Sequence, residues 1–203
     1  RRIALVLANY PNRNGRIANG VGLDTPQSCV EILRALAKEG YGITSLPHNG
    51  DDLIAALTKS ITNDPEGSMG KTANQILDLD QYLAWFHQLP LPAQTQVKTQ
   101  WGMPDCDLKI AGIQLGNIFV GIQPPRGYDR DPSLNYHAPD LPPTHEYLAF
   151  YLWLRASFGI QAIAHIGKHG NLEWLPGKGI ALSENCFPEI ALGALPHFYP
   201  FIV

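Results

Sequence analysis

The stretch HIGKHGNLEWLPGK, residues 165–178, concentrates side chains that could do chemistry. His165 and His169 lie four residues apart, and Glu173 follows four residues later. Imidazole and carboxylate groups bind divalent metals and transfer protons near neutral pH. On a helix this spacing would place all three side chains on one face, as in zinc-protease helices. The stretch alone is compatible with a metal site, a substrate-binding loop, or a glycine-rich turn that happens to contain histidines.

A helix is disfavoured at these positions. Gly167 and Gly170 interrupt it, and each glycine in a helix interior costs about 1 kcal/mol relative to alanine. The run before it, IQAIAHI, is typical of a buried strand, so the polar groups are expected just after the carboxyl end of that strand. Open α/β sheets bind ligands at this edge. We therefore expect a loop, whose histidines either act on a ligand or hydrogen-bond to the backbone.

Neighbouring side chains extend this candidate site. Trp174 could shield Glu173 from water and so raise the pKa of its carboxyl towards a value useful for proton transfer. The alternative is a surface glutamate that caps a turn, with Trp174 in the core or in a pocket wall. Lys178 could meet an anionic substrate group, although a lone lysine is usually solvated.

Two other motifs contain candidate binding residues. In QPPRGYDRDP, the two prolines fix the backbone before Arg126, and Gly127 permits close approach, so the guanidinium could be held in place for a carboxylate. Tyr128 follows directly. In PPTHE, His145 lies in the first turn of an expected helix, where the positive end of the helix dipole favours the neutral imidazole.

A glycine-rich loop, NRNGRIANGVG, lies between an expected strand and an expected helix, as phosphate-binding loops do. It matches neither G-x-G-x-x-G nor the P-loop pattern G-x-x-x-x-G-K-[ST], so we assign no nucleotide to it. Arg13 and Arg16 could reach an anion there, but solvent-exposed loop charges are the simpler interpretation.

The elements that must position these residues indicate an α/β fold. Strands are expected at 3–8, 41–46 and 160–166, and a further pair in LKIAGIQLGNIFVGIQPP, broken at Gly116-Asn117. Helices are expected from Thr25 to Gly40, through Leu53 to Leu57, over about 72–89, and from Thr144 to Gly159, while 90–107 is mixed. The fold class is a mostly parallel sheet flanked by helices, Rossmann-like or flavodoxin-like, with irregular functional loops.

Composition excludes several classes of protein. The formal charge is −3 without a basic stripe, so no nucleic acid is expected. The longest apolar run, 147–154, is too short to cross a bilayer, so no membrane is expected. Cys29, Cys106 and Cys186 are scattered, which argues against a disulfide framework or a zinc ribbon and favours the cytoplasm.

The chain begins with Arg1, directly before an apolar run, and ends with the apolar Phe201-Ile202-Val203. We therefore expect residues 1–203 to be an internal fragment of a longer protein. A subdivision into an α/β lobe, 1–105, and a lobe with the His/Glu loop, 106–203, is compatible with the sequence.

Taken together, the motifs resemble one family. GNIFVGIQPPRGYDRDP, HAPDLPPTHEYLAFY and HIGKHGNLEWLPGK, with the amino-terminal RRIALVLANYPNRNGRIANGVGLDTPQSCVEILRAL, resemble the cobaltochelatase large-subunit (CobN) family, which is related to the porphyrin-binding H subunit of magnesium chelatase. The resemblance is strong at 1–40 and 110–203 and loose between about 45 and 105. HGNLEWLPGK and HAPDLPPTHEYLAFY are more similar to the cobalt enzyme.

The resemblance implies an ATP-dependent insertion of a divalent metal into a tetrapyrrole. The metal and macrocycle would be Co²⁺ and a corrinoid, hydrogenobyrinic acid a,c-diamide, in cobalamin biosynthesis, or magnesium and protoporphyrin IX. The large subunit would bind the macrocycle, while two partners, an AAA+ ATPase subunit and a second chelatase subunit, use Mg²⁺ in the hydrolysis of ATP. Cobalt would be the substrate metal, and no tightly bound cofactor is expected in this fragment, which alone would be inactive.

The resemblance, together with side-chain chemistry, also implies roles for residues. His165 and His169 would deliver the metal or accept protons, since imidazoles suit Co²⁺, and Glu173 would transfer protons. The side chains expected to contact the macrocycle are Arg126, Tyr128, His145, Trp174 and Lys178. Two alternatives stay open: a structural α/β module whose His/Glu loop supports architecture, and a stand-alone zinc hydrolase with three ligands and an open water position.

Overall fold

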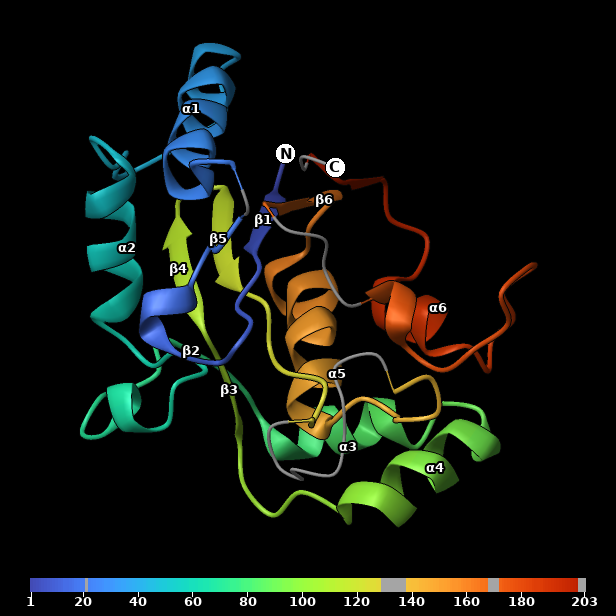
Figure 1. Ribbon diagram of the computed structural model, residues 1–203. Helices are drawn as coiled ribbons and strands as arrows, with labels where there is room; N and C mark the ends of the chain where they lie inside the picture. The colour runs from blue at the N-terminus through green and yellow to red at the C-terminus, as the bar shows by residue number, and fades with distance from the viewer. Residues whose placement is uncertain (21, 129–137, 168–171, 201–203) are drawn as a thin grey trace.

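The computed structural model describes residues 1–20, 22–128, 138–167 and 172–200 (Figure 1). Its central sheet consists of β1 (Ile3–Leu7), β4 (Gly112–Leu115), β5 (Ile118–Ile122), β6 (Ala162–Ile166) and β7 (His197–Phe198). The strand order is β4-β5-β1-β6-β7. Strand β1 pairs in parallel with β5 and β6, β6 pairs in parallel with β7, and β4 is antiparallel to β5. The expected α/β class with a mostly parallel sheet is confirmed.

The sheet is covered on both faces. Its flanking helices are α1 (Thr25–Lys38), α2 (Gly50–Thr58) and α5 (His145–Leu152). Leu5 and Leu7 of β1 belong to the hydrophobic cluster that includes residues of α1 and α2. Ala4 and Val6 belong to a second cluster, which includes residues of α5. Figure 1 shows α1 and α2 on one side of the sheet and α5 on the other, so the alternation along β1 divides the core into two halves.

Helix α5 is buried on almost every side. The Thr144 hydroxyl caps it by accepting a hydrogen bond of 3.2 Å from the backbone N–H of Tyr147. The helix continues as a π-helical segment, Trp153–Phe158, and stops at Gly159, whose φ of +73° lies in the left-handed region. Both predicted ends of this helix are confirmed.

A second layer packs against α5. It contains α3 (Leu79–Phe86), α4 (Leu91–Trp101), α6 (Phe187–Leu192) and a small antiparallel sheet of β2 (Gln75–Leu77) and β3 (Leu108–Ile110). Residues of all three helices join the hydrophobic cluster around α5. Short helical turns lie at η1 (Asn14–Arg16), η2 (Glu66–Ser68) and η4 (Leu172–Trp174).

The predicted strand pair around Gly116-Asn117 is confirmed as the hairpin of β4 and β5, with a φ of +68° at Gly116. The predicted strand at 41–46 is wrong, because these residues form no regular element. Instead, the Gly42 carbonyl accepts a hydrogen bond of 2.7 Å from the N–H of Asn117 and supports the hairpin turn. Tyr41 and Ile43 of this stretch pack on the core without joining the sheet, and Leu46 is exposed.

The single helix predicted over 72–89 is also wrong in part. Its first residues form β2, which pairs with β3, and the helix starts only at α3, where the Asp78 side chain accepts a 3.0 Å hydrogen bond from the N–H of Gln81. The mixed stretch at 90–107 contains α4. Pairing with a strand about thirty residues away is invisible to local periodicity.

The subdivision at 105/106 stays a prediction, although β1 of the first part lies between β5 and β6 of the second. In the described part of the chain, no helix is long and apolar enough to pass through a bilayer.

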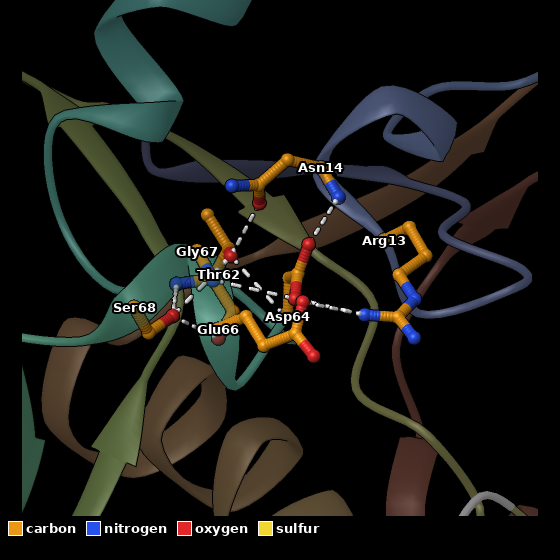
Figure 2. A network of polar contacts seen from close by, with 7 residues as sticks. All are labelled: Arg13, Asn14, Thr62, Asp64, Glu66, Gly67 and Ser68. Carbon is orange, nitrogen blue, oxygen red and sulfur yellow. Dashed lines mark hydrogen bonds and ion pairs between the residues drawn. The ribbon is translucent and has the colours of Figure 1, made fainter.

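A polar cluster, which we call the Asp64 clasp, ties the loop after β1 to the loop after α2 (Figure 2). Asp64 accepts hydrogen bonds from the backbone N–H groups of Asn14, at 3.0 Å, and Gly67, at 3.3 Å. The Thr62 hydroxyl donates to the Asn14 side-chain oxygen at 2.6 Å and accepts the N–H of Asp64 at 3.2 Å. These bonds fix two loops that meet at the carboxyl edge of the sheet.

Arg13 of the glycine-rich loop faces carboxylates. Its Nη1 lies 3.8 Å from Asp64 and 3.3 Å from Glu66, as Figure 2 shows. The charge of Arg13 is thus matched within the clasp, in line with the structural interpretation of this loop. The Asn14 N–H is the largest influence that lowers the pKa of the Asp64 carboxyl, and the Gly67 N–H and Arg13 act in the same direction.

We expect Asp64→Asn to reduce the free energy of unfolding at pH 7 by roughly 1–2 kcal/mol, because charged hydrogen bonds are replaced by neutral ones. The folded-state pKa of Asp64 is lowered, so its stabilising contribution is present above the unfolded-state pKa of about 3.9 and is lost as pH falls through the folded-state pKa. The difference between wild type and variant should therefore shrink below about pH 4. Urea unfolding followed by tryptophan fluorescence measures this. The exposed Asp105→Asn serves as control, and equal stability of wild type and Asp64→Asn at pH 7 would contradict the clasp.

Candidate functional site

The imidazole of His165 lies inside the protein, on strand β6 beside Val6 of β1. The residue is 2% exposed. Its Nε2 is 2.8 Å from the Tyr151 hydroxyl of α5, and its Nδ1 is 2.7 Å from Nε2 of His197 in β7. Each ring nitrogen therefore has a hydrogen-bond partner, as a buried imidazole requires.

The hydrogen-bonded chain continues to the end of β5. The Gln123 side-chain Nε2 donates to the Tyr151 hydroxyl at 3.0 Å. The backbone N–H of Gln123 donates to the Leu7 carbonyl at 2.9 Å, and its carbonyl accepts a 2.7 Å hydrogen bond from Asn63. The hydrogen-bonded chain thus joins β1, the end of β5, β6, β7 and helix α5, and Asn63 links it to the loop of the Asp64 clasp.

Burial of His165, and secondarily its neighbour His197, lowers the pKa of the His165 imidazole to about 3. The ring is therefore neutral at physiological pH. A neutral ring that is hydrogen-bonded at both nitrogens must give up a partner before it can take a proton or a metal ion. The geometry favours a positioning role for His165, and its roles as metal ligand and proton acceptor stay predictions.

Tyr199 connects the two histidines to Glu173. Its ring centre lies 5.6 Å from that of His165 and 5.1 Å from that of His197. Its hydroxyl donates to Oε2 of Glu173 at 3.3 Å. Tyr199 thus contacts both His165 and Glu173. Glu173 in η4 is exposed, in contrast to the expected shielding by Trp174. His169 lies outside the described residues.

Arg126 is completely buried. Its Nη2 donates to the carbonyl oxygens of Ala138, at 2.9 Å, and Leu141, at 3.1 Å. The neighbouring Gly127 has a φ of +113°, and a Cβ there would lie 2.4 Å from the Trp101 ring. This packing is consistent with the predicted rigid position of Arg126. The guanidinium, however, donates hydrogen bonds to backbone carbonyls inside the protein. Its contact with a macrocycle stays a prediction.

His145 is also buried, at the start of α5. Its Nδ1 lies 2.7 Å from the Tyr82 hydroxyl, and its Nε2 lies 2.9 Å from the Gly102 carbonyl. Because a carbonyl can only accept, the Nε2–H donates to it and Nδ1 accepts from the tyrosine. This arrangement ties α5 to α3 and α4, and a substrate contact of His145 stays a prediction.

The remaining candidates are Tyr128, Lys178 and Trp174. Tyr128 packs edge-on against Tyr10, with ring centres 5.3 Å apart, beside a pocket of about 420 Å³ that Arg13 and Glu66 also line. Lys178 is exposed, and its backbone N–H donates to the Cys186 sulfur at 3.3 Å. Trp174 is half-buried in η4. Their contacts with a macrocycle stay predictions.

The sequence patterns do not single out Gln123, Tyr151, His197 or Tyr199 as site residues. Tyr151 is part of the apolar stripe of its helix, and the run PHFYPFIV is mostly apolar. The available signal is the spacing of His197 and Tyr199, which places them on one side of an extended chain. Within 1–20, 22–128, 138–167 and 172–200, no group of three or more His, Cys, Asp or Glu side chains is arranged to hold a metal ion.

Comparison with known proteins places this arrangement in a family. The profile described as CobN/Magnesium Chelatase matches residues 1–203. The aerobic cobaltochelatase subunit CobN of Pseudomonas aeruginosa is 52% identical over 210 residues, which cover 100% of this chain and 17% of that protein. The H subunit of magnesium chelatase from Chlorobaculum parvum is 31% identical over 213 residues, which cover 100% of this chain and 16% of that protein.

A solved structure agrees with the sequence relatives. The catalytic subunit of cobaltochelatase from Mycobacterium tuberculosis superposes with a TM-score of 0.84 and 40% identity, over 100% of this chain and 18% of that one. The chain thus spans about 17% of the length of the curated relatives. The resemblance seen in the motifs is confirmed: this chain belongs to the CobN/magnesium chelatase family.

Proposed function

We propose that this chain is a catalytic segment of the large, tetrapyrrole-binding subunit of an ATP-dependent cobaltochelatase. The reaction is the insertion of Co²⁺ into a corrinoid, hydrogenobyrinic acid a,c-diamide, in cobalamin biosynthesis. The observation that carries this proposal is a cluster beside the carboxyl end of β6. In it His165 and His197 share a hydrogen bond, and Tyr199 packs against both rings and donates its hydroxyl to Glu173. The cluster lies at the edge where parallel sheets bind ligands.

The chemistry of metal insertion matches this cluster. A macrocycle must lose its ring N–H protons as the metal enters, so the protein needs proton acceptors held at a fixed place. Glu173 presents an exposed carboxylate that the Tyr199 hydroxyl orients. Tyr199 in turn packs against His165, which is fixed by its own hydrogen bonds. Glu173 accepts a proton in this proposal, and His165 holds the surrounding residues in position.

Partner subunits supply the energy. Two of them, an AAA+ ATPase subunit and a second chelatase subunit, use Mg²⁺ in the hydrolysis of ATP, which makes the complete assembly a ligase-type enzyme of the cytoplasm. The loop after β1 supports this division of labour, because it matches neither nucleotide-binding pattern and its Arg13 pairs with Asp64 and Glu66. The segment alone is inactive in this proposal, since it is a small part of the subunit.

The second candidate function is that of a magnesium chelatase, whose H subunit acts on protoporphyrin IX. Its support is the 31% identity to the subunit of C. parvum, which is lower than the 52% identity to the cobaltochelatase subunit of P. aeruginosa. A stand-alone zinc hydrolase has no such support. A purely structural module is the alternative that variants of Glu173 test.

Glu173→Gln in the full-length subunit, assembled with its partner subunits, should lower the rate of cobalt insertion about 10²–10⁴-fold, because the amide cannot accept a proton. Binding of the macrocycle, followed by its absorbance, should change little. Glu184→Gln, at another exposed glutamate, is the matched control. Wild-type turnover of Glu173→Gln would show that the cluster is architectural.

The wild-type assembly should form product with Co²⁺ and the corrinoid, and only when ATP is present. Because the metal and the macrocycle are varied independently, absorbance spectra of the products identify both. Magnesium insertion into protoporphyrin IX, with no reaction of the corrinoid, would establish the second candidate function instead.

A further inference from the structure

His197 differs from His165 in its exposure. It lies on β7 at the edge of the sheet and is only half-buried, while its neighbour is almost fully buried. Its Nε2 is 2.7 Å from Nδ1 of His165. No described residue forms a hydrogen bond with its other ring nitrogen, Nδ1. One side of this imidazole is thus anchored in the protein and the other is available.

The hydrogen bond between His197 and His165 is compatible with two arrangements of the protons along the chain from Gln123. The Gln123 amide nitrogen can only donate, so the Tyr151 oxygen accepts from it. The proton of the Tyr151 hydroxyl can point to Nε2 of His165, whose Nδ1–H then donates to His197. Alternatively it points away from His165, and the Nε2–H of His165 donates to the Tyr151 oxygen.

In the second arrangement, His197 is in the tautomer that can accept a proton at Nδ1. His165 Nδ1 then accepts the Nε2–H of His197, and the lone pair of His197 resides on the available Nδ1. When Nδ1 takes up a proton, the Nε2–H remains hydrogen-bonded to the buried ring, which stabilises the imidazolium. Activated side chains in enzymes commonly follow this pattern: a second group orients the reactive one, and a third group orients the second.

We propose that His197 is a second proton acceptor of the site, beside Glu173, and that His165, Tyr151 and Gln123 are its positioning residues. This inference rests on the proposed function. A ring N–H bond of the macrocycle breaks, its electron pair stays on the pyrrole nitrogen and binds the incoming Co²⁺, and the proton forms a bond with Nδ1 of His197. The proton then passes to solvent, and no atom changes its oxidation state.

The surroundings of His197 support this assignment. Tyr199 packs against the His197 ring and donates its hydroxyl to Glu173, so both acceptors contact the same aromatic side chain.

His197→Gln is the sharpest variant, because the glutamine amide can donate to His165 from the place of Nε2 but offers no basic nitrogen. In the full-length subunit with its partner subunits, kcat for cobalt insertion should fall about 10²–10⁴-fold, with the KM for the macrocycle changed less than about threefold. His197→Ala should be rescued at least about tenfold by added imidazole, since the small base can occupy the vacated space. The control is His48→Gln, at an exposed loop histidine.

The outcomes separate the inference from the proposed function. If the wild-type assembly inserts cobalt and His197→Gln has a kcat within twofold of it, the inference alone is overturned. A large rise in KM at unchanged kcat, or a complete lack of rescue of a folded His197→Ala variant, also overturns it, because a structural role would then suffice. If the wild-type assembly inserts no cobalt while binding the macrocycle, the proposed function fails and the inference fails with it.

Discussion

A histidine buried between a sheet and a helix needs a hydrogen-bond partner for each ring nitrogen, and this requirement at His165 organises the site. An unpaired polar group in such a place costs roughly 1–3 kcal/mol. Helix α5 supplies Tyr151 on one side, and β7 supplies His197 on the other. The short edge strand β7 is therefore fixed by a polar contact as well as by its pairing with β6.

The rest of the fold provides the precision that this contact needs. Gly121 of β5 allows α5 to lie close to the sheet, because a Cβ there would lie 2.7 Å from the Phe150 ring. Gln123, two residues later, reaches Tyr151, and its carbonyl holds Asn63. The packing of α5 on the sheet, the hydrogen-bonded chain through Gln123 and the Asp64 clasp thus support one another along the carboxyl edge of the sheet. Such support by neighbouring residues is what keeps a reactive group in place.

Sequence reasoning succeeds where the signals are local. The strand β1, the helix capped by Thr144 and the turn at Gly116 follow from apolar runs, caps and glycine. Helix α1 is also predicted, but its cap is Asp24, one residue before Thr25. Sequence reasoning fails at 41–46, which forms no strand, and at β2, because strand formation and the pairing with β3 depend on tertiary contacts. His165 and Glu173 lie eight residues apart in the sequence, on β6 and in η4, and in the structure Tyr199 contacts both.

The other site residues depend on contacts that a single sequence does not reveal. His197 is 32 residues from His165, and only the pairing of β7 with β6 brings the rings together. Arg126 and His145 have the side chains of binding residues, but burial turns them towards carbonyl groups inside the protein. The sequence shows which chemical groups the side chains carry, whereas the direction in which each side chain points depends on how loops and helices pack.

The most direct measurement is a structure of the full-length subunit with its macrocycle bound. The account predicts that a pyrrole nitrogen lies within hydrogen-bond reach of His197 Nδ1 or of the Glu173 carboxylate, at about 2.6–3.2 Å or through one water. A macrocycle bound at another edge of the sheet, with neither group facing its ring nitrogens, would contradict it.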